Sequence, residues 1–342
     1  MRSKELVSLA LRGEPTPRTA AGPLAVHYCA QVAGRSIQEY TSNPVVLAGS
    51  VIRYWERFRP DAVWLSADTW VSAQAMGAKV GSPGENQPWS GLGPPLVKTA
   101  REIDRIPKPD PSAQGRYPLM LEALRLLLEA LGDEVFVVAC FDQYPFSLAS
   151  QLLGINETML KLLDDRPLVE ALMERCLEYG LAYGRALGEA GAHLLSGGDS
   201  PAGLVGPLSY REIALPYEKR LIARLKEATG KPVSLHICGD STAILEDMAG
   251  SGADVLEVDH KVDVALACRV VGPEIALWGN LDPVGKLARG SPAQVGEEAR
   301  RVLEAVRKAG HLRFVLSSGC TLALETPAPN LEALLRAPAQ LP

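Results

Sequence analysis

Three residues in the second half of the chain have the types and spacing of a metal site. His236 and Cys238 lie two residues apart at the end of an apolar run, and Cys320 lies far downstream. In an extended strand, residues i and i+2 point to the same face, so this imidazole and thiol are expected to converge. One nitrogen and two sulfur ligands form a zinc set with an open fourth position, as catalytic zinc requires. Spacing alone leaves an alternative: a polar pocket histidine and two small buried thiols.

Other polar residues follow predicted strands and are candidates for the same site. Asp199, which follows two glycines, is predicted as the catalytic carboxylate: a fourth zinc ligand, a gate between zinc and thiol, or a general base. A loop-capping aspartate is the alternative. The candidate substrate-binding residues are His27, Tyr28, Asp142, Asp259, His260 and Asn280.

Eight short apolar runs, most of them followed by helical patterns, are the elements that must position these residues. They cover residues 23–28, 62–66, 135–140, 192–196, 232–236, 254–258, 274–278 and 312–317. Continuous apolar runs without alternation are typical of strands buried on both faces of a parallel sheet. Eight such units predict a (β/α)₈ TIM barrel, whose active site lies at the carboxyl ends of the strands. A doubly wound sheet is the alternative, although no G-x-G-x-x-G follows the first run.

The linking segments complete the predicted architecture. A capping-box pattern at 209–212 predicts a helix toward Gly230, Pro167 predicts one reaching about Glu189, and Ser291 opens one ending near Gly310. Residues 68–118 are rich in Gly and Pro and have too little periodic apolar content for a core of their own. We therefore predict a single barrel domain over residues 1–342, with 68–118 as an excursion over the barrel mouth between strands 2 and 3.

Composition narrows the class of protein. The 342 residues are 47% hydrophobic and 22% charged, with a net charge of −5, which argues against nucleic acid or an anionic membrane as the main partner. Six scattered cysteines suit a reducing compartment rather than a disulfide scaffold. The amino-terminal segment lacks an uninterrupted apolar core, and no run of 18 uncharged apolar residues occurs. We expect a cytoplasmic protein with no signal peptide and no membrane span.

Several stretches of the second half carry a family resemblance. They are Asp199 with 207–217 (Pro-Leu-Ser-Tyr-Arg-Glu-Ile-Ala-Leu-Pro-Tyr), 236–240 (His-Ile-Cys-Gly-Asp), 279–283 (Gly-Asn-Leu-Asp-Pro), and 318–320 (Ser-Gly-Cys) with Thr326, Pro327 and Asn330 behind it. Together they resemble the uroporphyrinogen decarboxylase superfamily, and more closely its zinc-dependent branch of methylcobamide:thiol methyltransferases, typified by methylcobamide:coenzyme M methyltransferase. The resemblance covers roughly residues 190–335, with a weaker match at 34–40 and none at 70–120.

The resemblance implies a function. The family's H-x-C pattern with a lone downstream cysteine coincides with His236, Cys238 and Cys320, which implies zinc at these residues. It further implies that a small-molecule thiol is activated on zinc and exchanges a methyl group with the cobalt of a corrinoid (methylcobalamin). No D-x-H-x-x-G cobalamin signature occurs, so the corrinoid is expected on a small carrier protein that docks on the barrel. Related proteins run the transfer in reverse, from small methyl donors to the corrinoid, and the sequence leaves direction and substrate open.

Two departures separate the chain from the true decarboxylases. Their arginine-rich amino-terminal motif is reduced here to Gly34 and Arg35, and Gly319-Cys320 stands where they have glycine and histidine. Decarboxylation of a porphyrin-like or smaller acid is therefore the alternative reading. A further alternative is a non-catalytic barrel that binds a corrinoid protein or stores metal.

Overall fold

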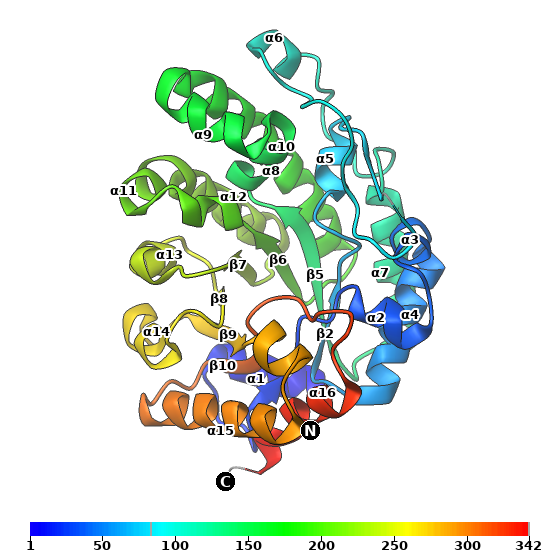
Figure 1. Ribbon diagram of the computed structural model, residues 1–342, viewed down its shortest axis with the longest axis vertical. Coiled ribbons are helices and arrows are strands. Elements are labelled where there is room, and N and C mark those ends of the chain that lie inside the picture. The colour runs from blue at the N-terminus through cyan, green and yellow to red at the C-terminus, as the bar shows by residue number, and fades with distance from the viewer. Residues whose placement is uncertain (83, 341–342) are drawn as a thin grey trace.

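The sheet of the protein is a nearly closed parallel barrel. The structure is a computed structural model that describes residues 1–82 and 84–340. Eight parallel strands follow the order β1-β10-β9-β8-β7-β6-β5-β2, as the ring of arrows in Figure 1 shows. They are β1 (Ala20–Ala21), β2 (Ala62–Leu65), β5 (Phe136–Gln143), β6 (Leu194–Gly198), β7 (Val233–Ile237), β8 (Val255–Val258), β9 (Ala276–Leu281) and β10 (Phe314–Ser318). This arrangement confirms the predicted (β/α)₈ barrel.

Helices surround the barrel and join consecutive strands. The α-helices before and after β2 are α1 (Ser3–Arg12), α2 (Tyr28–Ala33), α3 (Ile37–Ser42), α4 (Pro44–Phe58), α5 (Val71–Ala75), α6 (Ala100–Ile103) and α7 (Tyr117–Leu131). Those after β5 are α8 (Pro145–Leu153), α9 (Ile155–Asp164), α10 (Arg166–Glu189), α11 (Pro207–Ser209), α12 (Leu215–Thr229), α13 (Leu245–Ala249), α14 (Val264–Val271), α15 (Pro292–Lys308) and α16 (Ala328–Arg336). Short 3₁₀ turns cover Ser200–Leu204, Thr242–Ile244 and Ala337–Ala339, and π turns cover Tyr210–Ala214 and Pro283–Ala288.

The barrel closes between β1 and β2 through one residue, Asp61. Its backbone N–H donates to the Ala21 carbonyl at 2.8 Å, and its carboxylate accepts from the Ala21 N–H at 2.9 Å. Arg18 donates two hydrogen bonds to the same buried carboxylate, at 2.6 and 2.8 Å. This pairing replaces a regular ladder between the two edge strands.

Apolar side chains fill the barrel interior toward its amino-terminal end. The carboxyl end of the barrel is left for polar side chains. Trp64 and Trp278 meet edge to face with ring centroids 5.6 Å apart, and Phe136 packs beside them. Leu6 and Val7 of α1 belong to the same buried cluster, so α1 covers the amino-terminal end of the barrel. The carboxyl ends of the strands remain as the place where polar side chains gather.

The first strand was predicted in the wrong place. The structure forms β1 at Ala20–Ala21, whereas the expected strand at 23–28 is a turn that leads into α2. Gly22 donates to the Leu316 carbonyl, but the next N–H that faces β10, that of Leu24, donates to the Ser318 hydroxyl at 3.2 Å, and the regular ladder ends there. Pro23 has no N–H to donate on the other side, toward β2. The apolar residues after it are buried through the turn and the first turn of α2. The other seven predicted runs all overlap strands.

Two of the three predicted helices are confirmed, and the third begins earlier than expected. Helices α10 and α15 start as predicted, and Ser291 forms a capping box with Gln294. Ser209, by contrast, lies inside a helix that begins at Pro207 and passes through a π turn before α12. Pro216 cannot donate to the Glu212 carbonyl, and Arg166 approaches that carbonyl at 3.4 Å instead.

Residues 68–118 contain α5, α6 and the short antiparallel pair β3 (Val80–Gly81) and β4 (Ser90–Gly91). In Figure 1 this cyan segment passes beside α5 and α3 and reaches α6 at the top of the view. That the whole chain forms one domain stays a prediction. Within the described residues, no helix is both long and apolar enough to cross a membrane.

Candidate metal centre

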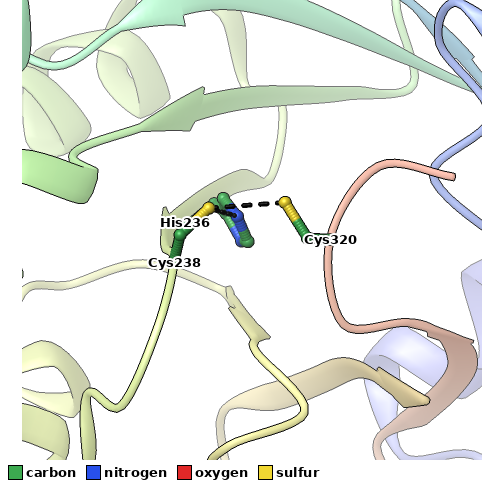
Figure 2. Close-up of side chains that lie close together, drawn as sticks. All are labelled: His236, Cys238 and Cys320. Carbon is green, nitrogen blue, oxygen red and sulfur yellow. Dashed lines mark hydrogen bonds between the residues drawn. The ribbon is translucent and has the colours of Figure 1, made fainter. Parts of the chain in front are cut away.

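The structure brings His236, Cys238 and Cys320 together at the carboxyl ends of the strands. His236 is on β7, Cys238 directly follows that strand, and Cys320 is two residues past β10. The imidazole Nε2 is 2.9 Å from Cys238 Sγ, and the two Sγ atoms are 3.4 Å apart. Figure 2 shows the Cys320 side chain reaching from its own loop toward the other two. All three potential ligand atoms lie within 4.8 Å of one another.

A neighbouring strand fixes the orientation of the imidazole. His236 Nδ1 is 3.0 Å from the backbone carbonyl of Glu257 on β8. Because a carbonyl oxygen only accepts, Nδ1 carries the proton and the Nε2 lone pair faces the two sulfurs. Histidine ligands of metals are commonly held in this way by a backbone carbonyl. The backbone of Cys238 is held as well, since its N–H donates to Ser200 Oγ at 3.3 Å.

Close backbone packing positions Cys320. The N–H of Gly319 donates to the Leu281 carbonyl at 2.7 Å, which ties the residue before the cysteine to β9. A Cβ at Gly319 would lie 2.4 Å from the backbone nitrogen of His260. Only glycine lets the two strand-end loops approach this closely.

The donor set fits a zinc ion. It supplies one imidazole nitrogen and two sulfurs with an oriented histidine, and three protein ligands leave a position for a substrate. Without a metal, protons hold these positions. Burial lowers the pKa of His236, but hydrogen bonding and charge from Cys320 outweigh it and raise that pKa to about 9. The hydrogen bond with Cys238, together with burial, raises the pKa of Cys320 to about 12.

The 3.4 Å separation of the two sulfurs predicts that they will oxidise as a pair when no metal is bound. A disulfide needs sulfurs about 2.05 Å apart, so a small side-chain movement suffices. We expect the metal-free protein to form close to one Cys238–Cys320 disulfide per chain with a mild thiol oxidant, and zinc to suppress the reaction. Peptide mapping with mass spectrometry measures this. Equal oxidation with and without zinc would contradict a metal at these thiols.

A cavity of about 340 Å³ opens beside the three residues. Its lining residues come from most of the strands and from the excursion: Leu24, Val26, His27, Trp64, Ser66, Asp68, Thr69, Pro88, Trp89, Cys140, Asp142, Gln143, Ser196, Gly197, Gly198, Ser200, His236, Cys238, Glu257, Cys320 and Thr321. Pro88 and Trp89 thus bring the 68–118 segment to the site. The volume suits a small molecule.

Two of the six predicted substrate-binding residues line this cavity. His27 does so with its Nε2 held at 2.7 Å from the Ala67 carbonyl, and Asp142 does so from the end of β5. Tyr28 does not, because it is the first residue of α2 and its ring packs in the core against Tyr54 and Phe58.

Asp259 and His260 lie in the turn after β8, Asn280 lies on β9, and none of the three lines the cavity. Asp259 accepts from the N–H groups of Gly239 and Lys261, each at 3.0 Å. His260 contacts Asp259, with 2.8 Å between Nδ1 and Oδ1. The Asn280 amide donates to the Asp259 and Val262 carbonyls. They hold the loop beside Cys238 in place.

Asp199 is not brought to the metal centre. It is completely buried, and its Oδ1 accepts from the Ser147 N–H and hydroxyl at 2.8 and 2.7 Å. It is absent from the cavity lining, although Gly198 and Ser200 on either side belong to it. The backbone turn after β6 directs the carboxyl group outward, toward α8 and Glu218 of α12. Burial raises the pKa of Asp199 to about 6, against the hydrogen bonds from Ser147 and Glu218.

This burial predicts a pH-dependent gain from Asp199→Asn. The folded-state pKa lies above the unfolded value, so the wild type loses stability as pH rises from about 3.8 to about 6. An amide keeps the acceptor for Ser147 without the charge. We expect the variant to gain roughly 1–3 kcal/mol in free energy of unfolding at pH 7.5, relative to its change at pH 4. Urea unfolding at both pH values tests this, with the exposed Asp104→Asn as control; a loss at pH 7.5 would contradict it.

Three residues of the site were missed by sequence reasoning. Glu257 is buried on β8 and lines the cavity, and a charged residue inside the apolar run 254–258 was the available signal. Arg116 and Trp89 lie in the excursion, where no strand pattern indicates which side chains face the barrel. Arg116 stacks over the Trp89 ring, with its guanidinium carbon 4.1 Å from the ring centroid.

Comparison with known proteins agrees with this class of site. A barrel with a histidine and two cysteines at its carboxyl end is a candidate metalloenzyme fold. A family model described as uroporphyrinogen decarboxylase (URO-D) matches residues 2–340. The chain therefore belongs to the uroporphyrinogen decarboxylase family.

The relatives carry two kinds of activity in their names. A methylcobamide:CoM methyltransferase of Methanosarcina acetivorans is 32% identical over 242 residues, covering 70% of this chain and 68% of that protein. A uroporphyrinogen decarboxylase of Nostoc punctiforme is 28% identical over 307 residues, covering 86% and 82%. A solved methyltransferase from Methanosarcina mazei superposes with a TM-score of 0.89 at 27% identity, covering 99% of both chains. These matches show the family of the chain, and the named activities of its relatives are methyl transfer and decarboxylation.

Proposed function

We propose that this protein is a zinc-dependent methyltransferase that moves a methyl group between a corrinoid on a partner protein and a small-molecule thiol or related compound. The convergence of His236, Cys238 and Cys320 beside a cavity of small-molecule size carries the proposal. The methyltransferases among the relatives support it.

The residues of the chain have defined roles in this proposal. His236 Nε2 and the two sulfurs would hold the ion, with the Glu257 carbonyl fixing the imidazole. Zinc bound there would lower the pKa of a thiol in its open position, so that thiolate exists at neutral pH. The buried cavity walls exclude water from that sulfur and orient the molecule that bears it.

The size of the cavity bears on the second substrate. A cavity of about 340 Å³ is of small-molecule size, and the sequence contains no D-x-H-x-x-G cobalamin signature. We propose that a small carrier protein presents the corrinoid at the carboxyl end of the barrel. His236, Cys238 and Cys320 would hold the ion that binds the thiol sulfur, and the corrinoid would supply the methyl group and keep the cobalt–carbon electron pair when the sulfur–carbon bond forms.

Metal analysis and a turnover assay test the proposal together. We expect about one zinc per chain in the purified protein, and transfer from free methylcobalamin to at least one member of a thiol panel. Loss of transfer on chelation and its return with zinc would support the metal's role. A wild type without metal affinity would end the proposal.

Decarboxylation of a porphyrin-like acid is the alternative that the other relatives raise. A substrate with several carboxylates needs basic partners in a buried site. Among the described residues that line the cavity there is no lysine or arginine. This lining favours methyl transfer.

A further inference from the structure

The cavity beside the metal centre has an unbalanced set of charges. Three carboxyl groups line it, from Asp68, Asp142 and Glu257, whereas its described lining includes no lysine or arginine. The metal ligands come from β7 and the loops after β7 and β10, while Asp68 follows β2 and Asp142 lies near the end of β5, on the opposite arc of the barrel. A molecule with its sulfur at the metal centre therefore extends toward carboxyl groups.

The nearest guanidinium is already engaged. Arg116 is buried and donates to both carboxylate oxygens of Asp68 through two nitrogens. Its third nitrogen, Nε, donates to Gln74 at 2.6 Å, and its plane lies over Trp89. A bidentate pair of this kind neutralises Asp68 and leaves no cation for a substrate anion.

Asp142 has no such partner. A bulge interrupts the pairing of β5 with β6 between Cys140 and Gln143, and Asp142 within it has a φ of 83°. Its Oδ2 accepts from the Ser72 N–H at 2.7 Å, and within the described residues its Oδ1 has no hydrogen-bond partner. A non-glycine residue in this conformation is strained, and such strain concentrates at functional sites.

Glu257 adds a second carboxyl group near the metal ligands. Its Oε1 accepts from the hydroxyls of Ser196, at 2.8 Å, and Ser234. Its Oε2 lies 3.9 Å from His236 Nδ1. These contacts hold the Glu257 carboxyl group in place. The two serine hydroxyls are uncharged, and a neutral His236 adds no positive charge either.

We propose that the small molecule that reacts in this cavity is cationic or uncharged, with N–H or O–H donors facing Asp142, and that the site discriminates against anionic thiols. A buried anion without a cationic partner has a large desolvation cost, and nearby carboxylates add repulsion. This inference rests on the proposed function and specifies its substrate class.

The raised pKa of Asp142 agrees with the lack of a cationic partner for its carboxyl group among the described residues. Burial raises the pKa of Asp142 to about 7, and the charge of Asp68 adds to this more than Arg116 offsets it. An ammonium or hydroxyl group from a bound molecule would give the carboxylate the partner that the protein does not provide.

Three two-carbon thiols that differ in terminal charge test the inference: 2-aminoethanethiol, 2-mercaptoethanol and 2-mercaptoethanesulfonate. Binding to the cobalt(II)-substituted full-length protein is measured from the change that each thiol causes in the thiolate-to-metal absorption band, to which Cys238 and Cys320 already contribute. Each affinity is corrected for the free acidity of the thiol. We expect the cationic thiol to bind at least about tenfold more tightly than the sulfonate, with the neutral thiol between them. In Asp142→Asn this ratio should shrink severalfold.

The outcomes separate the two proposals. Sulfonate binding as tight as that of the cationic thiol would overturn the charge inference and leave zinc–thiol chemistry standing. No change in the band with any of the thiols would overturn the proposed function and this inference with it. The wild-type ratio decides even if Asp142→Asn does not fold, and an unchanged ratio in a folded variant would remove Asp142 from the recognition site.

Discussion

Replacing Cys320 by serine is expected to lower zinc affinity at least about 100-fold, because a neutral hydroxyl replaces a thiolate ligand. Methyl transfer to a thiol should fall to background at equimolar zinc. The fold should persist, since Cys320 is partly exposed and follows β10 rather than lying within it. Chelator competition with the purified protein measures the affinity, and circular dichroism verifies the fold.

Cys140 offers a matched control in the same cavity. It lines the pocket and is a free thiol, yet it does not belong to the converging group. Cys140→Ser should keep its zinc within a few-fold of the wild type. If Cys320→Ser retained full zinc while His236→Ala lost it, the metal would lie elsewhere around His236 and the assigned ligand set would be wrong.

Gly319→Ala should damage both stability and the metal centre. The added methyl group would lie 2.4 Å from the His260 nitrogen and 3.0 Å from the Asp259 carbonyl carbon, and both neighbours are backbone atoms. Backbone cannot rotate away as a side chain can, so the two loops must separate. We expect a loss of about 2–3 kcal/mol in free energy of unfolding. Zinc affinity should fall as well, because Cys320 moves with its neighbour.

Gly49→Ala is the matched comparison. Gly49 lies within α4, and a Cβ there would meet no atom within 4 Å. Alanine in a helix interior should stabilise the protein by about 0.5–1 kcal/mol. Denaturant unfolding of both variants tests the pair. Equal stability of Gly319→Ala and the wild type would show that the loops after β8 and β10 are looser than described.

The barrel and the positions of seven of its strands could be predicted because apolar runs identify strands buried on both faces. Residues 23–28 are the exception, since they are as apolar as a strand but begin with Pro23, which has no N–H to donate toward β2. Burial alone therefore does not distinguish a strand from a buried turn. The proline carried the missing information.

The candidate site was only partly predictable for a related reason. The i, i+2 spacing of His236 and Cys238 fixes their direction within one strand, so their convergence could be inferred. Directions in turns and at helix starts depend on single dihedral angles. For this reason Tyr28 and Asp199 face away from the cavity, although Tyr28 ends one predicted strand and Asp199 follows another. Glu257 was hidden because an isolated acidic residue in a strand has no spacing to interpret.

The closure of the barrel by a two-residue strand has a consequence for the order of folding. β1 pairs with β10 through Ala20 with Val315 and Ala21 with Leu316, so the first strand of the chain waits for one of the last. At roughly 5–20 residues per second, a ribosome takes many seconds to cover that distance. Cys320 emerges five residues after Val315. During synthesis, the complete ligand set therefore forms only around the time the ring closes, and zinc uptake would mark a finished barrel.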